Sequence, residues 1–397
     1  MRVETPRDAW LVGGVRSAFG RFGGALAGVP LVDLGTQIAR SALEHTGWAA
    51  ESLGDFNVGV GMIEAGLMVP ARQIAFEAGF RDDLPSITVD RACCSGTAII
   101  GMASRTLDGG TGSVLCLGVE TMSRTPRLLH RSRGTDRYGD LEVEDLLLMR
   151  SPLTGTSIAE YVGKVALEHG VDREAQDEWA LGSHSRYFAA RDAGFFDDEL
   201  VPVSTPDGEH TEDEPPRSDT SIEKLSALPT VRNSPTITAG NAPGLNDGAC
   251  AVVVATADEA ETHGRTPLAR IHSYLQTAGS PTSSAYLPGL AIQRLAEEAG
   301  ISLTDIDVIE INEAYAATPL VSIRRMAGAD PGLEKELMTR TNVNGGAVAI
   351  GHPIGASGTR LALTAARRLS RNGGRWAAVA ICGGFGQADA LLLELTS

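Results

Sequence analysis

Apolar and polar positions follow two alternating patterns over roughly the first 120 residues of the chain. Apolar residues spaced three and four apart predict helices at 31–45 and 95–107. Short apolar or β-branched runs predict strands at 9–13, 86–90 and 113–119. The last of these strands is apolar at most positions, as in a parallel strand that is buried on both faces. Strands that alternate with helices indicate an α/β fold.

The pattern weakens in the middle of the chain and then returns. Residues 122–245 lack a sustained apolar period, and residues 206–221 are rich in Asp, Glu and Pro, which predicts an inserted, solvent-facing segment. One helix is expected within the insertion, at 173–188. After the insertion the pattern predicts strands at 249–255, 307–311, 376–381 and 389–394, and helices at 290–299 and 355–370.

These elements predict two similar α/β halves with a loop-rich insertion between them. We expect the N-terminal half to comprise residues 1–121 with 246–268, the insertion to comprise 122–245, and the C-terminal half to comprise 269–397. A chain of 397 residues is long enough for at least two packed units.

The net charge and the cysteines limit which ligands and which cellular compartment we expect for this protein. The formal net charge is −16, whereas a nucleic-acid surface needs an excess of Lys and Arg, so nucleic acid is not an expected partner. A small anionic ligand needs only a local basic patch or a helix N-terminus. The five cysteines form no Cys-x-x-Cys pair, which predicts no metal site and a reducing, cytoplasmic environment. No apolar run is long enough to span a bilayer, and the first residues contain no apolar signal core.

Cys93 follows the predicted strand at 86–90 and stands at a turn before the helix at 95–107. At a helix N-terminus the macrodipole and free N–H groups stabilise a thiolate, so we expect the pKa of this thiol to be lowered. The same N–H groups can stabilise an oxyanion formed on an attacked carbonyl. Taken alone, such a cysteine is more often a small buried apolar residue, and the adjacent Cys94 leaves open which thiol points inward.

Four further segments carry candidate chemistry, and each also has a simpler structural interpretation. Cys382 ends a predicted strand, and the N–H of Gly384 behind it fits either an oxyanion site or a tight hairpin turn. His352 precedes a predicted helix in a glycine-rich segment, and Asn312 follows a predicted strand. An imidazole can activate a thiol and an asparagine can hold a water or an oxyanion, although alone both are more often structural. The loop at 241–248 fits a ligand site or ordinary turns.

The joint occurrence of these segments, in this order, resembles the thiolase family of acetyl-CoA acetyltransferases and 3-ketoacyl-CoA thiolases over essentially the whole chain. The matching motifs are Arg16-Ser17-Ala18-Phe19-Gly20-Arg21-Phe22-Gly23-Gly24-Ala25-Leu26, Ala65-Gly66, Ala71-Arg72-Gln73, Cys93-x-Ser95-Gly96, Gly118-x-Glu120-Thr121-Met122-Ser123, Asp213-Glu214-x-x-Arg217, Thr238-Ala239-Gly240-Asn241, Asn312-Glu313-Ala314, Gly351-His352-Pro353 and Cys382-x-Gly384. The pattern Cys-x-Ser-Gly selects Cys93, not Cys94, as the nucleophile.

The resemblance implies a role for each candidate residue. Cys93 carries the acyl group after His352 takes its proton, and Cys382 transfers the proton at the α-carbon of acetyl-CoA. Asn312 holds a water that stabilises the enolate together with His352. The backbone N–H groups of Cys93 and Gly384 hold the acyl oxyanion.

The resemblance also implies a fold and a set of ligands. The fold is thiolase-like, with central mixed sheets sandwiched by helices. CoA is the co-substrate and is bound by the insertion, for which the matching positions are Arg217, Ala239, Gly240 and Pro243, and no permanently bound cofactor or metal is implied. A homodimer or homotetramer is expected, with acyl-CoA and CoA as partners and no membrane.

Some positions depart from the family pattern, and they leave the substrate open. Asp90 and Cys94 stand where asparagine and a small residue are usual, and Pro243 replaces a serine in the loop that lines the CoA tail. Phe385 stands where glycine or threonine is common. Tyr286 and the following leucine replace small residues, which predicts a reshaped acyl cavity. Acyl chain length, branching, pathway and preferred direction stay open.

Three other functions are weaker. A decarboxylating ketoacyl synthase also uses a cysteine nucleophile, but it lacks a second catalytic cysteine, so Cys382 disfavours it. A catalytically silent CoA-binding protein on the same fold is disfavoured because Cys93, His352 and Cys382 are all present. A dinucleotide-binding dehydrogenase is the weakest, since Gly384-Phe385-Gly386 is not followed by the required third glycine and helix.

Overall fold

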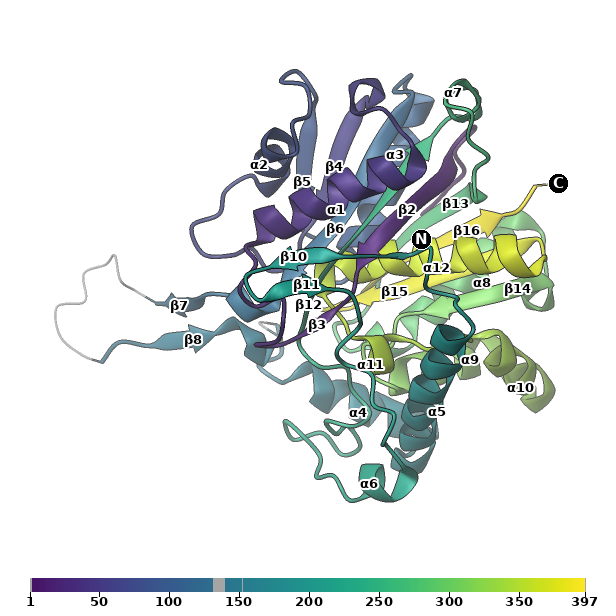
Figure 1. Cartoon of the computed structure of the whole chain (residues 1–397). Coiled ribbons are helices and arrows are strands. Elements are labelled where there is room, and N and C mark those ends of the chain that lie inside the picture. The colour runs from purple at the N-terminus through teal and green to yellow at the C-terminus, as the bar shows by residue number, and fades with distance from the viewer. Residues whose placement is uncertain (1, 131–139, 152, 397) are drawn as a thin grey trace.

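The computed structural model describes residues 2–130, 140–151 and 153–396. Its main feature is a large mixed β-sheet with the strand order β14-β15-β16-β13-β2-β12-β6-β4-β5 (Figure 1). These strands are β2 Trp10–Ser17, β4 Asp55–Gly59, β5 Ser86–Val89, β6 Ser113–Thr121, β12 Asn246–Ala255, β13 Ala269–Ala278, β14 Ile306–Ile311, β15 Trp376–Gly383 and β16 Gln387–Glu394. The short strands β1 (Arg2–Glu4), β3 (Gly20–Arg21) and β9 (Leu200–Val201) pair with β13, β12 and β2.

The sheet consists of two halves, which join where β13 meets β2 through Ala269 and Arg270. In the N-terminal half, β4 is parallel to β5 and β6, while β12 is antiparallel to β6 and β2. In the C-terminal half, β14 is parallel to β15, while β16 is antiparallel to β15 and β13. Both halves are mixed, and the expected α/β fold class is confirmed.

Helices cover both faces of each half-sheet (Figure 1). Helices α3 (Ser95–Asp108) and α12 (Ile354–Asn372) lie between the halves, because each contacts strands of both. Helices α1 (Leu31–Thr46) and α2 (Pro70–Glu77) cover the outer face of the N-terminal half. The outer face of the C-terminal half is covered by α8, with α9 and α10 packed beside it. Their bounds, and those of two shorter helices, are α8 Leu287–Ala299, α9 Ala317–Ala327, α10 Pro331–Arg340, α7 Ala257–Thr262 and α11 Ala347–Ile350.

The side-chain alternation of β12 explains why both of its faces need helices. Ala251 and Val253 pack with α1 on one face, and Val252 and Val254 pack with α3 and α12 on the other. All ten residues of β12 are buried. A strand that is apolar at successive positions is stable only where it is covered on both sides.

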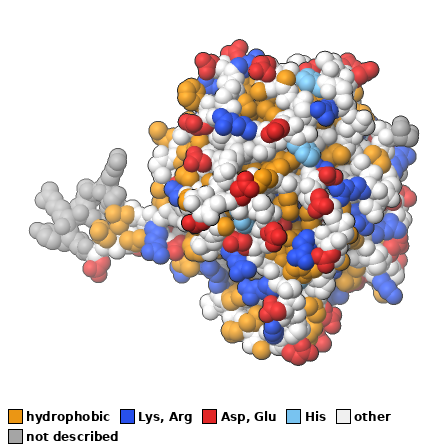
Figure 2. All heavy atoms as spheres, viewed as in Figure 1, with side chains coloured by type: hydrophobic (Ala, Val, Ile, Leu, Met, Phe, Trp, Pro, Cys, Tyr) orange, Lys and Arg blue, Asp and Glu red, His pale blue; other side chains and the backbone are white. Residues whose placement is uncertain are grey.

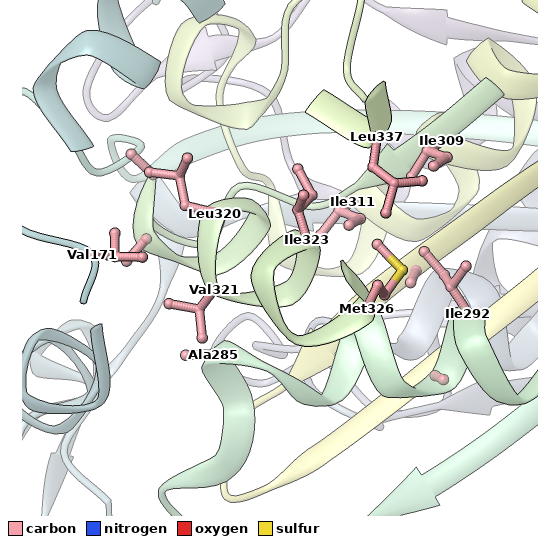
Figure 3. Packing of buried hydrophobic residues seen from close by; sticks show 14 of the residues in the cluster. Val171, Ala285, Ile292, Ile309, Ile311, Leu320, Val321, Ile323, Met326 and Leu337 are labelled. Carbon is pink, nitrogen blue, oxygen red and sulfur yellow. The ribbon is translucent and has the colours of Figure 1, made fainter. Parts of the chain in front are cut away.

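A second core holds the C-terminal half together (Figure 3). The side chains that point toward one another come from α9, β14, α8 and α10, with Val171 and Ala285 at the edge. The α9 and β14 members are Leu320, Val321, Ile323, Met326, Ile309 and Ile311. Leu320, Ile323 and Met326 recur every three residues along α9, which gives that helix an apolar face toward this core.

The insertion is more regular than its sequence pattern suggests. It contains α4 Ile158–Glu168, α5 Arg173–Asp192, α6 Ile222–Ser226, β7 Arg127–Leu129, β8 Val143–Asp145, β10 Val203–Thr205 and β11 Gly208–His210. The antiparallel hairpin of β7 and β8 projects from the body of the molecule (Figure 1). The helix expected at 173–188 is α5, which continues to Asp192.

The expectation that residues 206–221 face solvent is wrong for Asp213. Its side chain is buried and forms two hydrogen bonds with Arg16, at 2.7 Å and 2.9 Å, while the Phe19 N–H donates to it at 2.7 Å. Arg16 is itself fully buried in β2, which runs to Ser17 and not to the predicted end at residue 13. Charged side chains are expected at the surface. This carboxylate and this guanidinium are buried together because each is the charge and hydrogen-bond partner of the other.

The surface carries acidic and basic side chains interspersed over the visible face (Figure 2). Among the described residues, no helix has the length and apolar composition needed to cross a membrane. The same residues contain no group of three or more His, Cys, Asp or Glu side chains placed to hold a metal ion.

Candidate active site

Cys93 lies on the sharp turn between β5 and α3. Ala92 has a positive φ of 50°, which is uncommon for a residue with a side chain and tightens the turn. Ser95 holds this conformation, since its Oγ accepts from the Arg91 N–H at 2.9 Å and donates to the Ala92 carbonyl at 2.6 Å. Cys94 occupies the helix N-cap position and is buried, while Cys93 is partly exposed.

His352 comes from a turn just before α12, and its side chain reaches Cys93. Its Nε2 lies 3.2 Å from the Cys93 Sγ, although 259 residues separate the two in the sequence. Its Nδ1 lies 2.6 Å from the Oγ of Ser357, and that Oγ donates to the Pro353 carbonyl at 2.9 Å. The single hydroxyl proton of Ser357 is thus committed to Pro353, so its oxygen accepts from Nδ1–H. This leaves the lone pair of Nε2 directed at the thiol, as a general base requires.

Close helix contact brings these two turns together. A Cβ at Gly96, in the first turn of α3, would lie only 2.5 Å from the backbone nitrogen of Thr359 in α12. A Cβ at Gly118 in β6 would lie 2.4 Å from the carbonyl oxygen of Gly355. Larger residues at these glycines would force α12 away from β6 and α3, and would separate His352 from Cys93.

Asn312 directly follows β14, and its side chain is fully buried. Its Nδ2 lies 3.4 Å from the His352 Nε2, which places it beside the same thiol. Its Oδ1 has no hydrogen-bond partner among the described residues. A buried acceptor without a protein partner normally binds water, so the expected water-holding role has a suitable atom.

Cys382 lies in β15, two residues before a tight turn into β16. Phe385 and Gly386 in this turn both have positive φ, 60° and 79°. The backbone N–H groups of Gly384 and Cys93 both act on the Cys93 thiol to lower its pKa, against the larger effect of burial. The hairpin interpretation of this segment and the oxyanion interpretation are therefore compatible, because the same turn aims the Gly384 N–H at the first thiol. A hairpin at this point also excludes the helix that a dinucleotide-binding loop needs.

The expected lowering of the Cys93 pKa is wrong. Burial raises the pKa of this thiol, and the nearby Cys382 adds to the shift, while the Gly384 N–H opposes it. Burial also lowers the pKa of His352 to about 4, with a contribution from the positive charge of Arg360, and raises the pKa of Cys382 to about 12. Desolvation penalises every charged form in the enclosed site. The resting pair is thus a neutral thiol beside a neutral imidazole, and the proton moves only when the sulfur attacks.

Sequence reasoning missed two carboxylates that build the site. Glu120 is fully buried at the end of β6 and accepts from the N–H groups of Gly61, Met62 and Gly355, at 2.9 Å, 3.0 Å and 2.9 Å. It thereby joins the loop after β4 to the start of α12. Glu120 was visible only as a member of a family motif, and its role depends on backbone groups that no sequence pattern identifies.

Glu313 has a similar role on the other side of His352. It accepts from the Trp179 Nε1 at 2.8 Å, the Ser183 Oγ at 2.8 Å, the Asn342 Nδ2 at 2.9 Å and the Val348 N–H at 2.9 Å. One buried carboxylate therefore connects α5 to the glycine-rich segment that leads to His352.

Two further positioning side chains also escaped the sequence analysis. Asn246 accepts the His352 N–H at 2.9 Å and donates to the Gly20 carbonyl at 3.0 Å. Ser357 orients the imidazole as described above. Its only signal in the sequence was its place five residues after His352, in the first turn of a predicted helix.

A cavity of about 400 Å³ opens beside this site. Three of the four positions expected to bind CoA line it, namely Arg217, Ala239 and Gly240, whereas Pro243 does not. Two cationic side chains that the sequence analysis did not assign to CoA also line it, Arg21 and Lys224. His184 lines it as well, and burial lowers the pKa of this imidazole. Asn246, which holds the backbone of His352, lies on the same wall. The cavity thus combines positive charge with a wall residue, Asn246, that contacts the His352 backbone.

Comparison with known proteins agrees with this geometry. Residues 9–258 match the family of the thiolase N-terminal domain, and residues 265–395 match that of the thiolase C-terminal domain. The chain belongs to the thiolase family. A thiolase is an acyltransferase that uses CoA as a substrate, so the reaction class and the CoA dependence are established for this chain at that level.

This thiolase is similar to relatives whose names differ in substrate. Acetyl-CoA acetyltransferase of Cupriavidus necator is 36% identical over 98% of this chain and 99% of its own length. Mitochondrial 3-ketoacyl-CoA thiolase of Bos taurus and β-ketoadipyl-CoA thiolase of Pseudomonas putida are also 36% identical, with the same two coverages. The crystal structure of human mitochondrial 3-ketoacyl-CoA thiolase in complex with CoA has a TM-score of 0.92 at 34% identity, and covers 98% of both chains. Equal similarity to three named activities does not select a substrate.

The unusual residues of this thiolase occupy distinct places. Asp90 accepts from the Ala92 N–H at 2.9 Å, a turn-forming bond that an asparagine side chain makes equally. Tyr286 stacks edge-on against His169 and packs under Arg325, so its described contacts lie on the side of α8 and α9. None of these contacts involves the thiols or His352.

Proposed function

We propose that this thiolase catalyses CoA-dependent thiolytic cleavage of a 3-ketoacyl-CoA to acetyl-CoA and a shortened acyl-CoA, or the reverse Claisen condensation. The acyl group is carried by Cys93. The observation that carries the proposal is the 3.2 Å distance between the Cys93 Sγ and the His352 Nε2, with the Gly384 N–H directed at the same sulfur. Acyl transfer requires a nucleophile, a base that takes its proton and an N–H group that stabilises the oxyanion. These three groups meet around the Cys93 sulfur.

In the first step, His352 accepts the thiol proton as the Cys93 sulfur attacks the 3-keto carbon. The oxyanion that forms is held by the N–H groups of Cys93 and Gly384. His352 is neutral before the step because its pKa is lowered to about 4, and its Nδ1–H is held by Ser357. The imidazole therefore begins in the protonation state and tautomer that the step needs.

In the second step, the carbon–carbon bond breaks and the enolate of acetyl-CoA leaves. The Cys382 thiol gives its proton to the α-carbon, and Asn312 with the protonated His352 stabilises the enolate oxygen. The raised pKa of Cys382, about 12, makes this thiol a donor that stays protonated until a carbanion forms. A second CoA then gives its proton to the Cys382 thiolate and takes the acyl group, and the released Cys93 sulfur recovers its proton from His352.

CoA is proposed to lie in the 400 Å³ cavity, with its phosphates near Arg217, Arg21 and Lys224. Ala239 and Gly240 present a small-residue wall for the pantetheine arm, and the cavity ends at Asn246 beside the His352 backbone. Pro243 was expected to belong to this wall but does not line the cavity. The support for this placement is the combination of cationic side chains with Asn246, which lines the cavity and accepts the His352 N–H.

We also propose a homodimer or homotetramer in a reducing, cytoplasmic compartment. The sheet order ends at β5, and apolar side chains are exposed around this edge: Met68 at 75%, Val69 at 67%, Phe76 at 67% and Ile87 at 43%. An edge strand with an apolar surround is a natural pairing surface. All five cysteines are free, which suits a reducing environment.

The proposed reaction is tested by measuring CoA-dependent cleavage of acetoacetyl-CoA and of longer and branched 3-ketoacyl-CoAs. Turnover is expected on at least one of them, with acyl-Cys93 trapped after rapid quenching. The Cys382→Ala variant should still become acylated from a simple acyl donor, yet its condensation rate should fall by ~10²–10⁴-fold. Normal condensation by this variant would rule out the role assigned to Cys382.

A further inference from the structure

Arg91 lies two residues before Cys93, and its side chain reaches strand β16. Its Nε donates to the Asp389 Oδ1 at 2.9 Å, and one terminal nitrogen donates to the Gln387 Oε1. The other terminal nitrogen donates to the carbonyl of Thr277 in β13 at 3.4 Å. One guanidinium therefore contacts two strands of the C-terminal half, from a turn that belongs to the N-terminal half.

Asp389 is an internal anchor for this arginine. Its side chain is fully buried, and its second oxygen accepts from the Tyr274 hydroxyl at 2.8 Å. Gln387 and Asp389 are two residues apart on β16, so they lie on the same face of the sheet. These two contacts fix the orientation of the Arg91 side chain, because a planar guanidinium that contacts two side chains of one strand cannot rotate without losing a hydrogen bond.

The same turn also touches β15, on both sides of Cys382. The Cys94 Sγ donates to the Ile381 carbonyl at 3.4 Å. A Cβ at Gly383 would lie 2.7 Å from the Cys94 sulfur and 2.9 Å from the Arg91 carbonyl oxygen. The turn that carries Cys93 is thus packed against the residues before and after Cys382, while Arg91 holds the partner strand.

We propose that Arg91 and Asp389, with Tyr274 and Gln387, form a clamp that sets the position of the Cys382–Gly384 hairpin relative to the Cys93 turn. These are positioning residues, and the proposal rests on the proposed function of the two thiols. The clamp joins one half of the molecule to the other at the place where the reacting groups meet. Misplacement by about 1 Å can cost ~10²-fold in rate.

The clamp affects some steps and not others, and this distinguishes it from a general contribution to stability. Proton transfer between Cys93 and His352 depends on the contact of α3 with α12. Of the clamp residues, Tyr274 packs against α3 beside Gly101 and Arg105, and it is kept in the variants below. Oxyanion binding by Gly384 and proton transfer by Cys382 both depend on the hairpin. Loss of the clamp should therefore lower turnover but spare simple alkylation of Cys93.

The test uses the double variant Arg91→Met/Asp389→Asn, which removes both charges with little change in volume. Replacing both partners of a buried pair is often tolerated, whereas removing one leaves an uncompensated charge. We expect kcat for thiolysis to fall at least tenfold, KM to change less than threefold, and alkylation of Cys93 by iodoacetamide to stay within threefold of the parent protein. The matched control is Glu394→Gln at the far end of β16, where Glu394 pairs with Arg375 at 2.8 Å, and its kcat should be unchanged.

A second measurement does not depend on turnover. The thiol cross-linker dibromobimane, followed by peptide mass mapping, should join Cys93 to Cys382 in the parent protein and in Glu394→Gln. The yield should fall at least fivefold in the double variant. If the parent shows no thiolase activity but the cross-link is lost in the double variant, the clamp holds and the proposed function fails.

Three results would overturn the clamp. The first is a folded double variant with normal kcat and cross-link yield. The second is a loss of alkylation in step with kcat, because the defect would then lie in Cys93 and His352. If the double variant does not fold, Gln387→Met serves instead, since it removes one contact without burying a charge. For Gln387→Met we expect a two- to fivefold lower kcat with unchanged alkylation of Cys93. An unchanged kcat in Gln387→Met is the third result that would overturn the clamp.

Discussion

The proposed reactivity of Cys93 depends on a neutral imidazole beside it and not on a stabilised thiolate. Its thiol is partly buried and its pKa is raised, and the imidazole 3.2 Å away is held in one tautomer by Ser357. A thiol in this state loses its proton to His352 only as its sulfur attacks an electrophilic carbon. This arrangement protects the nucleophile from adventitious oxidation, because the thiolate is the form that oxidants attack.

Replacing Cys93 by serine should abolish turnover and covalent acyl labelling. A histidine with a pKa of about 4 is too weak a base to generate an alkoxide. Peptide mass mapping after incubation with an acyl donor should place the acyl group on Cys93 in the parent protein. Cys116→Ala, a change at another buried cysteine in β6, should retain both labelling and turnover. Acyl label on Cys94 would show that the neighbouring thiol is the nucleophile.

The lowered pKa of His352 sets the expected pH dependence. Its folded pKa of about 4 lies below the usual value of 6.5, so the neutral base is present above pH ~5 and is lost as pH falls through 4. Alkylation of Cys93 by iodoacetamide should therefore change little between pH ~5.5 and ~8 and decline only below pH ~5. In His352→Asn the rate should be lower and should rise with hydroxide concentration. An inflection near pH 6.5 in the parent protein would contradict the assigned environment.

At the scale of the elements, single buried carboxylates connect segments that are distant in the sequence. Glu120 joins the loop after β4 to α12, Glu313 joins α5 to the segment before His352, and Asp213 joins the insertion to β2. Each accepts several hydrogen bonds, which offsets the cost of burying a polar group. Burial nevertheless raises the pKa of Glu120 to about 8. Helices and strands hold the protein together through apolar packing, and these carboxylates determine where the catalytic turns lie.

Glu313→Ala tests this role. The change leaves four donors without an acceptor in the interior, and each unsatisfied group costs about 1–3 kcal/mol. We expect the free energy of unfolding to fall by at least ~3 kcal/mol, measured by urea denaturation monitored by far-UV circular dichroism. The control Glu336→Ala removes a partly exposed carboxylate that pairs with Arg340 on α10, and it should cost less than ~1 kcal/mol. Equal losses in the two variants would show that Glu313 is not a structural centre.

At the scale of the whole molecule, the unpaired edge at β5 predicts association. Light scattering at micromolar concentration should show a dimer or tetramer, because homo-oligomers with closed symmetry are the common form of assembly. Ile87→Lys places a charge on the exposed face of β5 and should shift the population toward smaller species. Leu167→Lys on α4, which is exposed to a similar extent, should leave the mass unchanged. A monomeric parent protein would contradict the proposal.

The sequence by itself predicted many of the elements in their order and the residues proposed as reactive groups. Helices α1, α3 and α12 and strands β6 and β12 were predicted because their apolar residues recur with the period of the element. Strand β13 and helices α9 and α10 were not predicted, since their apolar residues are interrupted by polar ones that pack only in the folded state. Residue type and motif selected the four site candidates Cys93, His352, Cys382 and Asn312. Such residues can be recognised in a sequence because they carry thiol, imidazole or amide groups, which apolar core residues lack.

Only the tertiary structure decided how these groups behave. The contact between Cys93 and His352 spans 259 residues and depends on the approach of α3 to α12 at glycines. The direction of the Cys93 pKa shift was predicted wrongly because a local argument includes the helix terminus and omits desolvation by distant segments. Asp213 was expected in solvent for the same reason, because its partner Arg16 lies 197 residues away in the sequence. Burial and electrostatics are properties of the assembled interior, and no local window of sequence contains them.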